Sequence, residues 1–181
     1  MLGLEQGAVE LVPHQMVWDG IAKDTIIVLK GIFDAAALDI QHIGSTSISG
    51  IHAKPILDIC VGVRALEDVT PYFEKLEYHG FIFRGHDVAE QLLFVMGDLK
   101  RNTRTHHVHI VRWNGAAWHN YINFRDYLNA FPEKANRYDQ KKRRLADLFA
   151  DNRKGYTQGK QELIDILLKE AKLWRMGTTA Q

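Results

Sequence analysis

Two short segments of this chain carry most of the side chains that could bind a phosphate or a metal ion. In the first, Gly44, Ser45 and Thr46 form a small-residue turn between an expected strand and an expected helix. Such a turn leaves backbone N–H groups and a hydroxyl free to face an anion. In the second, Asp58 lies in an apolar run, where its carboxylate can hold Mg²⁺ against phosphates bound by the turn. A purely structural role also stays open, with Ser45 or Thr46 capping a helix and Asp58 paired with a lysine.

Two histidines offer further metal ligands. His107 and His109 alternate with Val108 and Ile110, so in a strand both imidazoles lie on one face. Together with Asp58 they would make a set of two histidines and one carboxylate, which suits Mn²⁺, Zn²⁺ or Fe²⁺ better than Mg²⁺. The alternative is a pair of hydrogen-bonded histidines that line a polar cleft or contact phosphate.

Basic residues are concentrated in the segment 133–160, which holds nine Lys or Arg and four acidic residues. Arg137, Lys141 and Arg144 recur at helical spacing on one side, where they could line a groove for a triphosphate or a nucleic acid. For the neighbouring Lys142 we expect an ordinary solvated helix face.

Hydrophobic periodicity indicates the elements that must position these side chains. A nearly continuous apolar run rich in β-branched residues predicts a central strand over 55–63. Lys54 immediately precedes this strand and is therefore expected to contact a phosphate held near Asp58. Other strands are predicted over 9–12, 39–43, 92–96 and 105–112. Helices are predicted over 15–33, 65–78, 117–130, 132–149 and 159–174.

This order of elements predicts an α/β (α+β) protein, in which a mixed sheet with flanking helices is followed by a helical C-terminal third. We expect one domain over 1–174, with the sheet core in about 9–115 and the helical part in 116–174. The last residues, 175–181, are expected to form a flexible tail.

Composition and charge exclude several classes of protein. The 181 residues are 46% hydrophobic and 25% charged, a globular composition of the size of one domain. The formal net charge of +1 argues against a protein that coats nucleic acid by bulk charge. The single cysteine cannot form an intramolecular disulfide, and no signal peptide or membrane-length apolar run is present. We therefore expect a cytoplasmic protein with no membrane partner.

The segment HIGSTSISGIHAKPILDICVGV, residues 42–63, resembles the signature of the GrpB family. That family belongs to the nucleotidyltransferase superfamily, which has the DNA polymerase β-like catalytic fold. Further segments that resemble the family are HVHIV, FRDYL and YTQGK, at 107–111, 124–128 and 156–160. The resemblance covers nearly the whole chain.

The superfamily pattern places Gly-Ser at the start of a helix and two alternating acids on the next strand. Gly44 and Ser45 match the first part and Asp58 matches the first acid, but Cys60 stands where the second acid is expected. Phosphoryl transfer with two metal ions needs several carboxylates. Either other residues supply ligands here, or the fold is kept as a binding site without nucleotidyl transfer.

The resemblance implies binding of a nucleoside triphosphate or related phosphoester with a divalent cation, Mg²⁺ or Mn²⁺, with Zn²⁺ as an alternative. The reaction it implies is transfer of a nucleotidyl group to a small acceptor, with pyrophosphate leaving. In this interpretation Asp58, His107 and His109 are the catalytic and metal-binding residues. The expected phosphate contacts are Gly44, Ser45, Thr46, Lys54, Lys141 and Lys160. An inactive module that binds a ligand or partner, and an enzyme that uses a transition metal, stay open as alternatives, and nucleic acid is not the expected partner.

Overall fold

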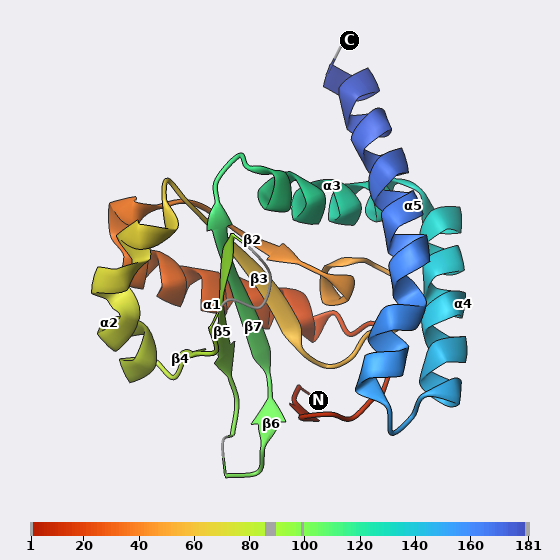
Figure 1. Cartoon of the computed structure of the whole chain (residues 1–181), viewed down its shortest axis with the longest axis horizontal. Helices are drawn as coiled ribbons and strands as arrows, with labels where there is room; N and C mark the ends of the chain where they lie inside the picture. The colour runs from red at the N-terminus through yellow and green to blue at the C-terminus, as the bar shows by residue number, and fades with distance from the viewer. Residues whose placement is uncertain (1, 86–89, 99, 180–181) are drawn as a thin grey trace.

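The structure of this chain, a computed structural model, describes residues 2–85, 90–98 and 100–179 (Figure 1). Its strands are β1 (Leu4–Glu5), β2 (Ala37–Ile43), β3 (Leu57–Val63), β4 (Ile82–Phe83), β5 (Gln91–Met96), β6 (Thr103–Arg104) and β7 (His106–Arg112). Its α-helices are α1 (Val17–Phe33), α2 (Phe73–Tyr78), α3 (Ala116–Ala130), α4 (Pro132–Leu148) and α5 (Arg153–Thr179). Short 3₁₀ helices are η1 (Asp34–Ala36), η2 (Ser45–Ser47) and η3 (Leu66–Tyr72).

The centre of the fold is a five-stranded mixed sheet with the strand order β2-β3-β7-β5-β4. β3 and β7 are parallel neighbours, while β2 pairs antiparallel with β3 and β5 pairs antiparallel with β7. The parallel register sets Asp58 beside His107 and Cys60 beside His109. Because side chains alternate across a strand, these four residues lie on the same face of the sheet.

The opposite face of the sheet forms the main hydrophobic core. Leu57, Ile59 and Val61 on β3 are fully buried there and pack with Trp18 and Phe33 of α1. α2 contributes to the same cluster. The sequence of β3 is a nearly continuous apolar run because both faces of the strand are covered.

The face that carries Asp58 is covered by the helical C-terminal third (Figure 1). Ile43, Cys60, Val111 and Trp118 form a small cluster between the sheet and α3. A separate apolar cluster holds α3, α4 and α5 together, and α4 and α5 lie side by side. Among the described residues, no helix is both long and apolar enough to span a bilayer.

The predicted mixed α/β architecture and its helical C-terminal third are confirmed, with several differences in the elements. The strand predicted over 9–12 is wrong, because there only Val12 forms an isolated bridge, to Ala53. The helix predicted over 65–78 is divided into η3 and α2, and Pro71, which lacks an N–H, lies in the 3₁₀ part. The short strands β1, β4 and β6 were not predicted.

The last helix is much longer than predicted, since α5 begins at Arg153 and ends at Thr179. The glycines near the start of this helix led to the prediction of a later start, because glycine weakens a helix. Gly159 instead permits close packing, because a Cβ there would lie 2.5 Å from Leu145 Cδ2 of α4. The flexibility expected of 175–181 stays a prediction; its residues 175–179 are helical, and 180–181 lie outside the described residues.

Candidate functional site

The turn after β2 brings the backbone against Asp58. Gly44 has a φ of +71° and a ψ of −171°, a conformation that favours glycine. A Cβ at this position would lie 2.4 Å from Asp58 Oδ2 and 2.9 Å from Asp58 Cβ. Only glycine therefore allows this close approach. The helix expected to follow the turn is the three-residue η2, so no long helix N-terminus faces this site.

Asp58, His107 and His109 converge as the alternation of the strands predicted. One ligand atom from each lies within 4.8 Å of the others. His107 Nδ1 lies 3.2 Å and His109 Nε2 lies 3.5 Å from Asp58 Oδ1. The Asp58 side chain is 28% exposed, so the group faces an open space and is not sealed in the core.

The electrostatics of this group favour an ionised carboxylate. Burial acts to raise the pKa of Asp58, but hydrogen bonding from His107 and His109 and their electrostatic attraction outweigh burial. The net effect holds the pKa of Asp58 well below its usual range. Asp58 is therefore an anionic ligand at neutral pH.

A second layer of hydrogen bonds orients His109. Tyr121 donates its hydroxyl proton to Gln91 Oε1 over 2.9 Å, and its oxygen lies 3.4 Å from His109 Nδ1. A tyrosine oxygen in this position can accept a hydrogen bond from Nδ1–H, which is the tautomer that leaves Nε2 free to bind a cation. Neither Tyr121 nor Gln91 was predicted as a site residue, and the two lie on α3 and β5, far apart in the chain.

Next to Asp58 is a cavity of about 110 Å³ that we call the lysine pocket. Three of the residues lining it are Lys54, Lys142 and Lys160, and Asp58 and His107 also line it. Tyr156 lies between two of these cations, with its ring centre 4.7 Å from Lys54 Nζ and 4.5 Å from Lys160 Nζ. The other residues lining it are Ser45, Thr46, Ala53, Ile56 and Tyr156.

A bound anion would stabilise the protonated form of the three lysines. Burial, together with the nearby charges of Arg153 and Lys160, lowers the pKa of Lys54 to about 8. Burial and Arg153 lower the pKa of Lys160 to about 8, against the attraction of Asp58. Burial also lowers the pKa of Lys142 to about 7. Among the described residues that line the pocket, Asp58 is the only carboxylate beside the three lysines, and such an excess of cations is typical of a site that receives a negative ligand.

Lys142 was missed, because its helix face was expected to be solvated. The residue is only 1% exposed and donates to the backbone oxygen of His52. Asp139, one turn before it, accepts from His52 N over 2.6 Å and lies 3.0 Å from His52 Nδ1, which fastens α4 to this loop. The sequence does hold a signal: Lys142 falls in the apolar stripe formed by Tyr138 and Leu145 at helical spacing, which marks the buried face of α4.

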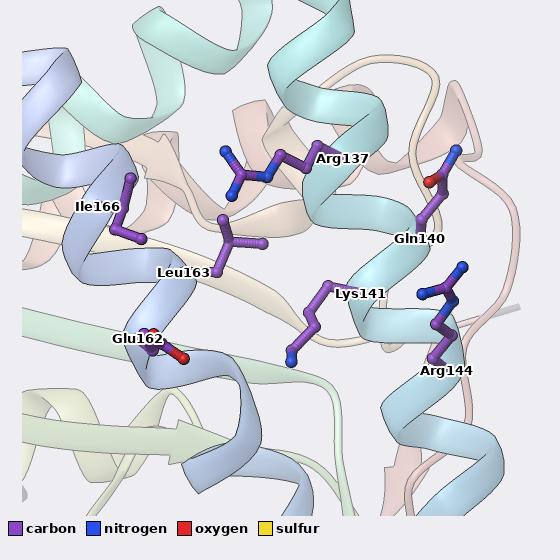
Figure 2. A pocket seen from close by; sticks show the side chains of 7 residues that line it. All are labelled: Arg137, Gln140, Lys141, Arg144, Glu162, Leu163 and Ile166. Atoms are coloured by element: carbon purple, nitrogen blue, oxygen red, sulfur yellow. The ribbon is translucent and has the colours of Figure 1, made fainter.

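Lys141 lies away from the lysine pocket. It lines a separate groove on α4 and α5 with Arg137, Arg144 and Glu162 (Figure 2). Neighbouring residues on a helix point about 100° apart, so Lys141 and Lys142 face different sides of α4. The structure therefore brings Lys54 and Lys160 to Asp58, as expected, but not Lys141.

The remaining predicted residues have their own partners. The Thr46 hydroxyl lies 2.9 Å from His42 Nε2, and Thr46 is buried. Ser45 makes a side-chain hydrogen bond with Tyr138. Cys60 is fully buried in the cluster under α3, where burial raises the pKa of its thiol, so it is not one of the candidate metal ligands.

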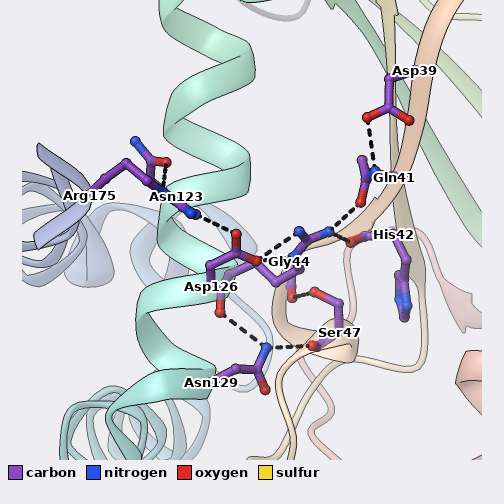
Figure 3. Close-up of polar contacts among 10 residues, drawn as sticks. Asp39, Gln41, His42, Gly44, Ser47, Asn123, Asp126, Asn129 and Arg175 are labelled. Carbon is purple, nitrogen blue, oxygen red and sulfur yellow. Dashed lines mark hydrogen bonds and ion pairs between the residues drawn. The ribbon is translucent and has the colours of Figure 1, made fainter. Parts of the chain in front are cut away.

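Polar contacts from α3 hold the turn at Gly44 in place (Figure 3). Arg125 donates to Gln41 Oε1 and to the backbone oxygen of His42, both over 2.9 Å. Asn129 donates to the backbone oxygen of Ser47, and its own oxygen accepts from Ser49 N. Arg125 thereby fastens the helical third to the sheet.

Comparison with known proteins identifies the family. A family model described as GrpB protein matches residues 8–170. The chain belongs to the GrpB family. The Glutamate-rich protein GrpB of Alkalihalophilus pseudofirmus is 37% identical over 173 residues, which cover 94% of this chain and 99% of that protein. The crystal structure of the conserved protein GrpB from Enterococcus faecalis has a TM-score of 0.83 and 31% identity, over 91% of this chain and 99% of that one.

Members of the GrpB family differ in length. The UPF0157 protein YqkA of Bacillus subtilis is 35% identical over 170 residues, which cover 93% of this chain and 49% of YqkA. The chain therefore spans about half the length of YqkA. The predicted family and fold class are confirmed, while the roles of the individual site residues stay predictions.

Proposed function

We propose that this GrpB-family protein binds a nucleoside triphosphate or a related phosphoester together with a divalent cation. In the catalytic form of the proposal, it transfers a nucleotidyl group to the hydroxyl of a small acceptor. The acceptor oxygen forms a bond to the α-phosphorus, the bond from that phosphorus to the oxygen bridging it to the β-phosphorus breaks, pyrophosphate leaves with the electron pair, and the proton of the acceptor hydroxyl passes to water.

The observation that carries the proposal is the meeting of two kinds of side chain at one cavity. A carboxylate with two imidazoles offers ligands for a cation, and three lysines beside it offer charge for phosphates. Asp58 and His107 belong to the metal group and also line the lysine pocket. A phosphoester that carries a divalent cation matches both halves of this arrangement.

The donor set supports one cation. Asp58, His107 and His109 would hold it, and when bound it would polarise a phosphoryl oxygen. Two nitrogens and one oxygen suit Mn²⁺ or Zn²⁺ better than Mg²⁺. Elemental analysis of protein purified without added metal tests the identity of the ion, and stoichiometric zinc or manganese is the expected result.

The protein side chains have separable roles in this proposal. Lys54 and Lys160 neutralise phosphate charge, and Lys142 adds a third cation from α4. Ser45, at the shared edge of the pocket and the turn, offers a hydroxyl to a phosphate oxygen. Gly44 keeps the turn close to Asp58. The residues that contact phosphate and the residues that hold the cation therefore contact the same phosphoester.

A thermal-shift screen tests binding, because a ligand that binds only the native state raises the melting temperature. Nucleoside triphosphates and coenzyme A precursors are screened with Mg²⁺, Mn²⁺ or Zn²⁺, using the wild type, Asp58→Asn and Lys160→Met. Lys141→Met is the matched control, since it removes a lysine outside the pocket. We expect a cation-dependent shift that both pocket variants lose and the control keeps; no shift with any ligand would overturn the proposal.

The second candidate is a module that binds the same ligand without transferring a nucleotidyl group. Cys60 favours it, because this thiol stands at the position of the second acid and is enclosed by Ile43, Val111 and Trp118. Incubation with a bound nucleoside triphosphate and candidate acceptors distinguishes the two functions. Pyrophosphate release that Asp58→Asn abolishes supports transfer, whereas tight binding without release supports the binding module.

A further inference from the structure

A second and larger cavity of about 500 Å³ opens on the other side of Asp58, against α3 and α5. Ser45, Asp58 and Lys160 line both this cavity and the lysine pocket. Asp58 therefore lies where the two spaces meet. A ligand with a phosphate in the lysine pocket can extend past Asp58 into the larger cavity.

The larger cavity has a different chemistry from the lysine pocket. Among its described lining residues only Asp58 and Lys160 carry charge, and both lie at the shared end. Elsewhere its polar side chains include three amides, and its apolar walls are aromatic and aliphatic. These amide, aromatic and aliphatic side chains are Gln91, Asn120, Gln161, Tyr121, Phe124, Ile164 and Leu168. We call this space the amide cavity.

Two of the three amide groups, those of Asn120 and Gln161, are available to a ligand, whereas Gln91 is buried and its oxygen accepts from Tyr121. Asn120 makes no side-chain hydrogen bond with another described residue, and it is exposed on α3. Gln161 donates to Asp165 over 2.9 Å, and no described residue donates to its carbonyl oxygen. Side-chain amides both donate and accept, so they recognise groups that present both kinds of edge. Phe124 and Tyr121 add ring surface, on which a planar group packs well.

We propose that the amide cavity binds the uncharged organic part of the phosphoester, and that this part is a planar heterocycle with hydrogen-bond donors and acceptors. The proposal rests on the proposed function, because it takes the phosphate end to lie in the lysine pocket. A cavity of this volume lies within the range of small-molecule sites. Its lack of cations beyond Lys160 disfavours an anionic group at the far end.

Leu168→Trp tests the proposal by filling the amide cavity, and Asn120→Ala removes one amide. Leu173→Trp is the matched control, because Leu173 lies on the same helix but is 71% exposed. Isothermal titration with Mn²⁺ present compares three probes: ATP, inorganic tripolyphosphate, and 4′-phosphopantetheine, whose organic part is a linear amide.

We expect Leu168→Trp to weaken ATP binding by about tenfold or more and to leave tripolyphosphate binding within about twofold of the wild type. Asn120→Ala should weaken ATP alone, by a smaller factor, and the control should match the wild type. Equal loss of ATP and tripolyphosphate, or no loss of either, would overturn the inference and leave the proposed function intact. Binding of 4′-phosphopantetheine but not ATP would exclude the planar ring. No binding of tripolyphosphate to the wild type would overturn the proposed function and this inference with it.

Discussion

Gly44→Ala is the substitution whose effect can be worked out most directly from the structure. The new methyl group faces two separate problems. At φ +71° and ψ −171° an alanine is strained, at a cost of about 1–3 kcal/mol. The Cβ would also lie 2.4 Å from Asp58 Oδ2 and 2.9 Å from Asp58 Cβ. Rotating the carboxylate relieves the first contact but not the second, because Asp58 Cβ is fixed to the central strand.

The clash adds about 1–3 kcal/mol if it behaves like overpacking elsewhere in proteins. The combined loss of about 2–6 kcal/mol corresponds to a melting temperature lowered by roughly 4–24 °C for a chain of this size. The variant should also lose affinity for Mn²⁺ or Zn²⁺, because Asp58 is pushed away from His107 and His109.

Gly50→Ala separates the two effects. Gly50 has a similar φ of +76°, but a Cβ there would meet nothing within 4 Å. Urea denaturation and metal titration are measured for both variants. We expect Gly50→Ala to show the strain alone and to bind metal as the wild type does. Equal stability loss in the two variants, with metal affinity unchanged in Gly44→Ala, would refute the reasoning about Asp58.

Three further predictions concern the groups around Asp58. Tyr121→Phe should weaken Mn²⁺ or Zn²⁺ binding about tenfold, measured by titration, because His109 loses the oxygen that orients it; an unchanged affinity would exclude this role. Tripolyphosphate affinity, measured without metal, should fall as the pH rises through about 8, because lysines with lowered pKa values lose their charge there. Lys160→Met should flatten this dependence and Lys141→Met should preserve it; a flat wild-type profile would contradict the assignment. For Lys142, the native pKa of about 7 lies below the ordinary 10.5, so the unfolded chain binds more protons between these values. The free energy of unfolding should therefore rise from pH 7 to 10 in urea titrations, and the rise should be smaller in Lys142→Met, where Lys54 and Lys160 with their pKa values of about 8 supply the remainder; a rise of the same size in wild type and variant would count against the lysine.

The core of the site could be predicted from sequence because it depends on short-range geometry. Alternation along a strand set His107 and His109 on one face, and it set Asp58 apart from its buried neighbours. Once β3 and β7 pair in parallel, these three residues meet. The small-residue turn indicated Gly44, and the family resemblance supplied Lys160 in addition.

The residues that were missed depend on packing between distant segments. Lys142 lies in the apolar stripe of α4, which marks the buried face of the helix, but that stripe alone does not show that this face packs beside Asp58. Tyr121 and Gln91 meet because β5 pairs with β7 in the sheet and α3 packs on β7. Cys60 could be placed on the face of Asp58, but its burial under Trp118 follows from where α3 lies.

The most direct test of the account is the coupling between a divalent cation and a phosphoester at Asp58. Two ligands that bind to the same protein change each other's affinity by the same factor. Isothermal titration measures Mn²⁺ affinity with and without ATP or tripolyphosphate, and phosphoester affinity with and without Mn²⁺. The account predicts equal, more than tenfold enhancement in both directions for the wild type and for Lys141→Met, and its loss in Asp58→Asn. Binding of the phosphoester that is independent of Mn²⁺, or coupling that persists in Asp58→Asn, would contradict it.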